Sequence, residues 1–158
     1  MDEDKTIRKH LISLLEGGNA HIKFGDAVKR FRIGDINRKP GNLPYSAWHL
    51  VEHMRITQYD ILDFVRNPDY KYMNWPDDYW PPKSRKASKN DWEKSIGSFR
   101  HNSNELKKIV NNPKTDLYSK IKHGEGQTVL REMLLVADHN AYHLGELVVL
   151  ARLVGAMK

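Results

Sequence analysis

Residues 45–65 carry the pattern that most restricts what this chain can fold into. Apolar side chains recur there every three or four residues, and neither glycine nor proline interrupts the middle of the segment. This spacing gathers apolar side chains on one face of an α-helix, whereas a half-buried strand would alternate apolar and polar residues. Residues 128–155 form a second long segment, which begins at a threonine suited to cap a helix. Both segments are predicted to be long helices.

Three other segments also have helical patterns. Residues 5–16 place four apolar side chains on one face and end at a pair of glycines. Residues 19–31 either form a short helix or continue the first one, with Gly25 lowering the helix propensity. Residues 91–110 are predicted to form a further long helix, with Ser88 in place to cap it. No segment has the alternation and turn signals of a β-strand, so the chain is predicted to be all-α.

A segment rich in proline and aromatic residues, 67–90, separates the second and third long helices. It contains four prolines and five aromatic residues. A flexible linker would not expose so much aromatic surface to water, so we expect an ordered loop packed over the body of the domain. Together, the patterns predict a single domain over residues 1–158, built as an antiparallel four-helix bundle.

Cysteine is absent, which excludes disulfides, thiolate metal ligands and a cysteine nucleophile. Any metal site must therefore use nitrogen and oxygen ligands. The first ten residues are charged, and no apolar run approaches the roughly 18 residues that a membrane span needs. We expect a cytoplasmic protein with no membrane partner.

The formal net charge of +6 is compatible with anionic partners. The basic residues are scattered, however, and their one dense cluster, residues 83–90, lies in the predicted loop. No motif that reads DNA is present. Among the function classes considered, a basic domain that binds nucleic acid is therefore the least favoured.

Two histidines near the C-terminus, His139 and His143, are four residues apart on a predicted helix. This spacing puts their Cβ atoms about 6 Å apart on one face, close enough to share an ion. Their neighbours at helical spacing are largely apolar, so both imidazoles should point into the bundle. The alternative is a pair of core histidines satisfied by hydrogen bonds. Hydrogen bonds satisfy two adjacent buried imidazoles less easily than one, because each imidazole has a donor and an acceptor nitrogen to pair.

A third ligand is expected from a facing helix, as is common in bundle metal sites. Residues 45–65 contain two candidates four residues apart, His49 and His53. His53 has apolar neighbours on its helix face and is the preferred ligand. His49 lies nearer the helix start and is expected to meet solvent, to lie near the pocket or to be structural. Three neutral imidazoles leave a coordination position open, which is typical of catalytic sites.

Further residues are candidates for supporting roles. Glu146 could orient a ligand imidazole or act as a general base, or it could be a plain charge at the edge of the bundle. Gln58 is a candidate polar group of the pocket, and Tyr142 is either a pocket residue or a packing aromatic. Trp75 and Trp80 are interpreted as packing residues. No catalytic residue is assigned, and Glu146 is the candidate.

Three stretches of the chain, in this order, resemble the DinB-like superfamily of small four-helix-bundle proteins. They are SAWHLVEHMRITQYDIL (46–62), WPDDYWP (75–81) and TVLREMLLVADHNAYHLGELVVLARLVG (128–155). The resemblance implies a bundle that binds one divalent metal through a histidine of the second helix and two of the last. On this chain these are His53, His139 and His143.

The resemblance also implies an activity. Some DinB-like proteins are transferases or isomerases that use bacillithiol, mycothiol or glutathione, with Zn²⁺, Ni²⁺ or a similar ion activating the thiol. The leading hypothesis is therefore a metal-dependent enzyme, possessing an S-transferase, isomerase or hydrolase-like activity on a small-molecule substrate and forming a homodimer. The alternative is a stress-related bundle that binds metal without catalysis.

Overall fold

The computed structural model describes residues 3–157 and is all-α over that range. It contains α1 (Glu3–Glu16), α2 (Phe24–Val28), α3 (Ala47–Arg66), the short 3-10 helix η1 (Asp77–Tyr79), α4 (Lys89–Asn111) and α5 (Val129–Leu153). Within residues 3–157 no strand forms, and extended backbone pairs only in an isolated bridge between Lys120 and Thr128. No helix in that part of the chain combines the length and the apolar character that crossing a bilayer requires.

Side-chain caps fix the starts of the three long helices. The hydroxyl of Ser46 accepts a hydrogen bond from the amide of His49 at the start of α3. Ser88 and Asp91 form a reciprocal capping box at the start of α4, and Thr128 caps α5 through the amide of Arg131. Each cap satisfies a backbone donor that has no partner inside its own helix. The caps predicted at Ser88 and Thr128 are thus confirmed.

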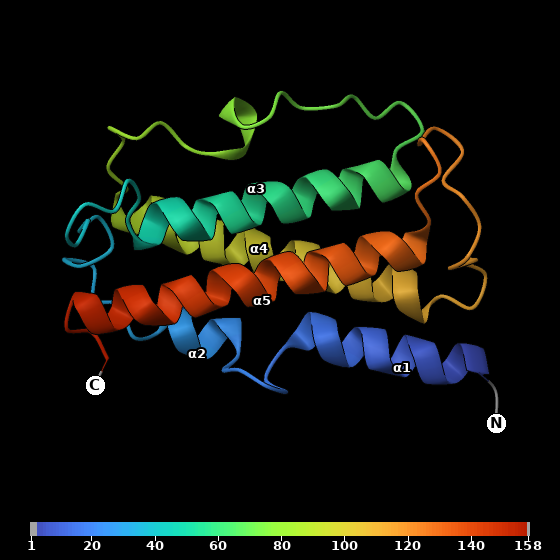
Figure 1. Cartoon of the computed structure of the whole chain (residues 1–158), viewed down its shortest axis with the longest axis horizontal. Coiled ribbons are helices and arrows are strands. Elements are labelled where there is room, and N and C mark those ends of the chain that lie inside the picture. The colour runs from blue at the N-terminus through green and yellow to red at the C-terminus, as the bar shows by residue number, and fades with distance from the viewer. Residues whose placement is uncertain (1–2, 158) are drawn as a thin grey trace.

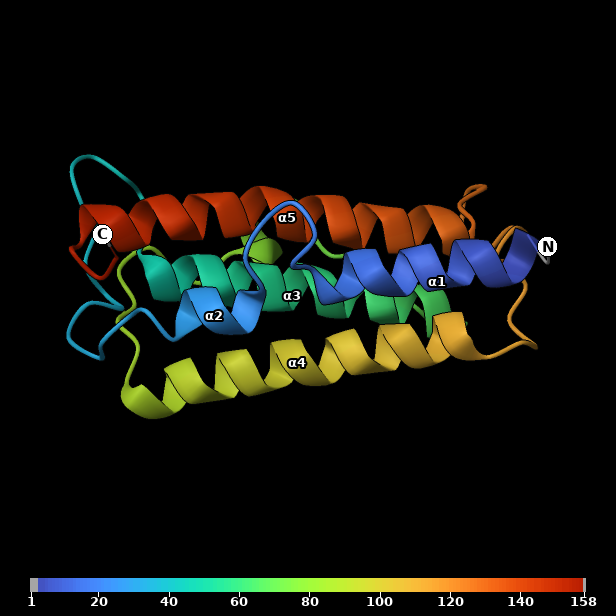
Figure 2. The same ribbon diagram turned by 90° about the horizontal axis from the view of Figure 1, so that it is seen from below.

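The long helices lie side by side, and α1 and α2 follow one another along the remaining side (Figures 1 and 2). The segment predicted over residues 19–31 is a separate short helix, α2, so the first of the two alternatives is correct. Residues 17–23 leave the line of the two helices and bulge away from α4 (Figure 2). Gly17 and Gly18 have φ of 67° and 85°, which only glycine adopts without strain.

The helix directions differ from the antiparallel order expected for successive helices. α3 and α5 run in opposite directions, whereas α3 and α4 run in the same direction (Figure 1). Trp48 donates to Ser95 and Gln58 donates to the carbonyl of Phe99, so residue numbers rise together along α3 and α4. Twenty residues of helix span about 30 Å, and the connecting residues 67–88 are long enough to return over that distance. In Figure 1 they run back along α3.

Two separate apolar clusters fill the interior, one toward each end of the bundle. The first uses residues 47–51 of α3 and 144–151 of α5, and the second uses residues 61–64 and 129–136 of the same helices. Between them, the buried positions of α3 and α5 include His53, Gln58 and His143. The helices thus present a polar layer between two apolar cores.

Candidate metal centre

The imidazoles of His53, His139 and His143 meet in this polar layer. The Nε2 atom of His53 lies 3.1 Å from Nε2 of His143 and 3.1 Å from Nε2 of His139. One ligand atom from each histidine falls within 4.8 Å of the others. His53 comes from α3, and the other two lie one turn apart on α5. The structure brings the three predicted residues together in a cluster that could hold a metal ion.

Burial differs among the three histidines. His53 and His143 are buried, with relative exposures of 2% and 8%, whereas His139 is partly exposed. Burial is the main cause that lowers the pKa of His53 to about 4 and that of His139 to about 3. Both imidazoles are therefore neutral near pH 7, which is the state that binds a metal.

The hydrogen bond of His53 fixes which of its nitrogens carries the proton. Its Nδ1 lies 2.8 Å from the backbone carbonyl oxygen of Tyr79. A carbonyl only accepts, so Nδ1 donates the proton and Nε2 of the neutral ring keeps its lone pair. That lone pair points to the centre of the cluster.

His143 is arranged in the same way by an acidic partner. Its Nδ1 lies 2.6 Å from the Glu146 carboxylate, which accepts the proton and leaves Nε2 free. The second carboxylate oxygen of Glu146 accepts from the hydroxyl of Tyr45 at 2.8 Å. Both oxygens of Glu146 thus hold a protein donor, which suits the orienting role more than that of a general base.

When both rings are neutral, these assignments direct the Nε2 lone pairs of His53 and His143 toward each other. Nδ1 of His139 is, in addition, buried without a hydrogen-bond partner among the described residues. Nitrogens bound to one zinc ion at about 2.05 Å lie about 3.4 Å apart in a tetrahedral site, and about 2.9 Å apart at octahedral angles. The observed separation of 3.1 Å falls between these values. The three imidazoles together could hold a cation at the centre of the cluster.

The indole of Trp80 covers one face of His53. The two rings are stacked, with centroids 3.8 Å apart and planes inclined by 4°. Trp80 belongs to residues 67–88, which also supply the Tyr79 carbonyl that accepts from His53. The sequence interpretation of Trp80 as a packing residue missed this contact, because nothing in the local sequence indicates which helix the loop crosses.

Asp60 ties the same segment to α3. Its carboxylate accepts from the hydroxyls of Tyr70 and Tyr79, at 2.7 and 2.8 Å. Burial, followed by the hydrogen bond to Asp60, raises the pKa of both tyrosines. Both phenols therefore stay protonated and donate at neutral pH. Asp60 anchors the segment two turns along α3 from His53, and sequence reasoning had assigned it no role.

The remaining predicted residues lie outside the cluster. His49 is buried, so the expectation that it meets solvent is wrong; its ring nitrogens contact the hydroxyl of Ser46 and the carbonyl of Pro82. Burial lowers the pKa of His49 as well. Gln58 donates to the Phe99 carbonyl and accepts from Asn140, which links three helices.

Tyr142 stands on the outer side of the cluster. It is 66% exposed, and its ring meets that of His143 edge to face, with centroids 4.9 Å apart. It therefore covers little of the interior and borders the cluster at His143.

The chain matches no family model, no curated protein and no solved structure. What its centre could do chemically therefore follows from the arrangement of the three imidazoles and their partners.

Proposed function

We propose that this chain is a metal-dependent enzyme of DinB-like type, in which His53, His139 and His143 hold one divalent ion. One observation carries the proposal: the Nε2 atoms of His53 and His143 face each other at 3.1 Å in a buried layer, while the Nδ1 atom of each ring donates to an oxygen acceptor. In neutral rings oriented in this way the two Nε2 lone pairs repel each other, and a cation between them removes the repulsion. Zn²⁺ and Ni²⁺ both suit imidazole ligands.

An ion held by three imidazoles keeps coordination positions open, and there it lowers the pKa of a bound water or thiol. Residues around the histidines orient the imidazole rings toward the ion. Tyr79 and Glu146 accept the Nδ1 protons of His53 and His143 and so direct both Nε2 atoms inward. His139, the least buried of the three, marks the side from which a small-molecule substrate or a low-molecular-weight thiol reaches the ion.

Metal analysis of protein purified without an affinity tag tests the site. We expect about one divalent ion per chain, lost in His139→Ala. His101→Ala is the matched control, because His101 is an exposed histidine on α4, and it should keep the ion. Wild-type protein that takes up no divalent ion, when Zn²⁺ and Ni²⁺ are offered after refolding, refutes the proposal.

Catalysis is tested separately with bacillithiol, mycothiol and glutathione, each paired with a panel of electrophiles. Turnover that depends on both thiol and metal supports a transferase. Bound metal with no turnover, and with no thermal stabilisation by any thiol, supports the non-catalytic metal-binding bundle instead. The DinB-like proposal also includes a homodimer, which sedimentation of the metal-loaded protein tests.

A further inference from the structure

The break between α1 and α2 leaves a gap on the surface of α4. The chain loops away from α4 over residues 17–23, so neither α1 nor α2 covers α4 along that stretch (Figure 2). A cavity of about 430 Å³ lies there. Sites for small molecules have volumes of this order. The gap lies between α4 and the N-terminal helices, whereas the histidine cluster lies between α3 and α5.

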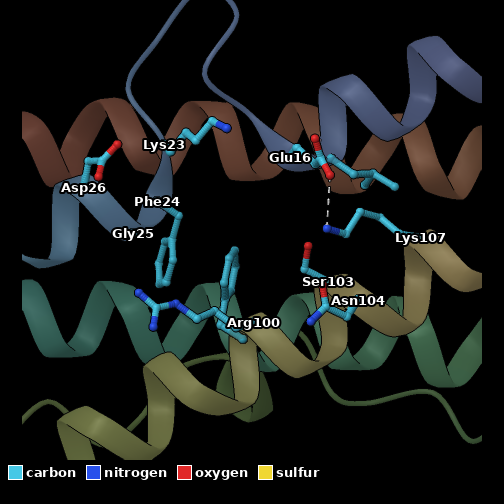
Figure 3. A pocket seen from close by; sticks show the side chains of 11 residues that line it. Glu16, Lys23, Phe24, Gly25, Asp26, Arg100, Ser103, Asn104 and Lys107 are labelled. Atoms are coloured by element: carbon cyan, nitrogen blue, oxygen red, sulfur yellow. Dashed lines mark hydrogen bonds and ion pairs between the residues drawn. The ribbon is translucent and has the colours of Figure 1, made fainter.

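Polar side chains of α4 form the floor of this gap. Arg100, Ser103, Asn104 and Lys107 recur every three or four residues and thus share one face of the helix. Lys23 extends from the opposite side, and its ammonium and that of Lys107 both point into the open space (Figure 3). Three cations from two separate segments therefore surround the cavity.

Most of these groups have no partner within the protein. Among residues 3–157, Lys23, Arg100, Ser103 and Asn104 form no side-chain hydrogen bond or ion pair. Lys107 contacts Glu16, with 3.4 Å between Nζ and Oε1, and this is the single contact marked in Figure 3. The other acid, Asp26, lies at the far end of the cavity from Lys107 (Figure 3). Uncommitted donors thus outnumber the acceptors.

An aromatic pair closes one side of the cavity. Phe24 and Phe99 are stacked, with ring centroids 3.9 Å apart. Gly25, next to Phe24, allows Arg100 to pass close by, since a Cβ atom at that position would lie 3.2 Å from the guanidinium. The gap therefore combines an apolar wall with cationic and neutral donors.

We propose that this gap binds a small aromatic phosphate monoester. Lysine binds phosphate as a point charge, so a dianion between Lys23 and Lys107 gains two cationic partners and can accept from Ser103 as well. Its aromatic group would lie against Phe24 and Phe99, where ring contacts add to the burial of apolar surface. The proposal does not depend on a metal at the histidine cluster.

Phenyl phosphate is the probe, titrated into the protein by calorimetry at low ionic strength, because salt screens exposed charges. We expect saturable binding, with inorganic phosphate weaker because it lacks the ring and benzoate weaker because it carries one charge. Benzoate binding as tight as phenyl phosphate would overturn the choice of phosphate. Failure of phenyl phosphate to saturate at millimolar concentration would overturn the site itself.

Two adjacent lysines of α4 supply a matched pair of variants. Lys107 lines the cavity, whereas Lys108 is not one of its lining residues and pairs with Glu105. We expect Lys107→Gln to weaken phenyl phosphate binding about tenfold, since a hydrogen bond to a charged group is lost, and Lys108→Gln to change it less than twofold. Equal weakening in both variants would show non-local attraction and overturn the assignment.

The His139→Ala variant separates this site from the metal centre, where a phosphate could also bind. Phenyl phosphate binding that persists in His139→Ala, and is still weakened by Lys107→Gln in that background, supports the gap. Binding that disappears in His139→Ala would place the phosphate at the histidines and overturn the proposal.

Discussion

The imidazole of His53 lies flat against the indole of Trp80, with ring centroids 3.8 Å apart and planes inclined by 4°. The next residue back along the chain, Tyr79, accepts the Nδ1 proton of the same imidazole. Two consecutive residues therefore fix both the plane and the rotation of one ring. The segment 67–88 is thus part of the candidate metal centre as well as the connection between α3 and α4.

Replacing Trp80 should weaken metal binding without removing a ligand. Trp80→Ala frees one face of His53 to water and to motion, and loss of such support typically lowers metal affinity 10- to 100-fold. Competition with a chromophoric chelator measures the change. Trp75→Ala is the matched control, because Trp75 lies in the same segment and is 73% exposed. Equal affinity in wild type and Trp80→Ala would show that the stack does not support the site.

Glu146 should act on the metal through His143. Glu146→Ala leaves the Nδ1 proton of His143 without its acceptor, and we expect metal affinity to fall by about 10- to 100-fold. Tyr45→Phe removes only the outer donor to Glu146 and should have a smaller effect in the same chelator assay. Glu93→Ala, on the exposed side of α4, should leave the affinity unchanged. If Tyr45→Phe lowers the metal affinity more than Glu146→Ala does, Tyr45 does not act on the site through Glu146.

Asp60 should control how firmly the 67–88 segment is held. Asp60→Asn turns one of two acceptors into a donor, so one tyrosine hydroxyl loses its bond and the other loses a charged acceptor. We expect a loss of roughly 1–3 kcal/mol in the free energy of unfolding, measured with urea, and faster tryptic cleavage around Lys83. Asp78→Asn is the control, since the Asp78 carboxylate accepts hydrogen bonds from the exposed Asn74 nearby. Unchanged cleavage in Asp60→Asn would mean that other contacts hold the segment.

The metal-free protein should lose stability as the pH falls from about 6.5 to about 4. The pKa of His53 is lowered from 6.5 to about 4, so in this interval the unfolded imidazole takes up a proton that the folded one does not. Proton uptake by the unfolded state lowers the free energy of unfolding as the pH drops. Urea titrations with a chelator present, at pH 7 and pH 5, measure the difference. His53→Gln should show a smaller difference, and an equal one would rule out this histidine as its source.

The positions of the helices follow from local sequence, and so does the set of candidate ligands. The helix predicted over residues 45–65 is observed as Ala47–Arg66, because uninterrupted apolar spacing leaves few other ways to bury that face. The spacing of His139 and His143 indicates a shared face by the same geometry. His53 then follows from the apolar residues around it on the facing helix.

Contacts made across the loop could not be predicted in this way. The direction of α4 relative to α3 depends on a connection long enough to permit either arrangement, and the hydrophobic pattern of a helix is the same in both. The burial of His49 depends on the carbonyl of Pro82, and the stack on His53 depends on Trp80. Pro82 lies 33 residues after His49, and Trp80 lies 27 residues after His53. The positions of both partners are set only once the segment has crossed α3.

The contact between α3 and α5 at the histidine cluster also bears on how the chain folds. His53 and His139 are 86 residues apart in sequence, and their nitrogens meet only after α5 has docked against α3. Contacts between distant parts of a chain form late, because the entropy of closing the loop opposes them. An ion at this centre would therefore bind the native state and not its half-formed precursors. Added metal should slow unfolding and should not change the rate of the early folding steps.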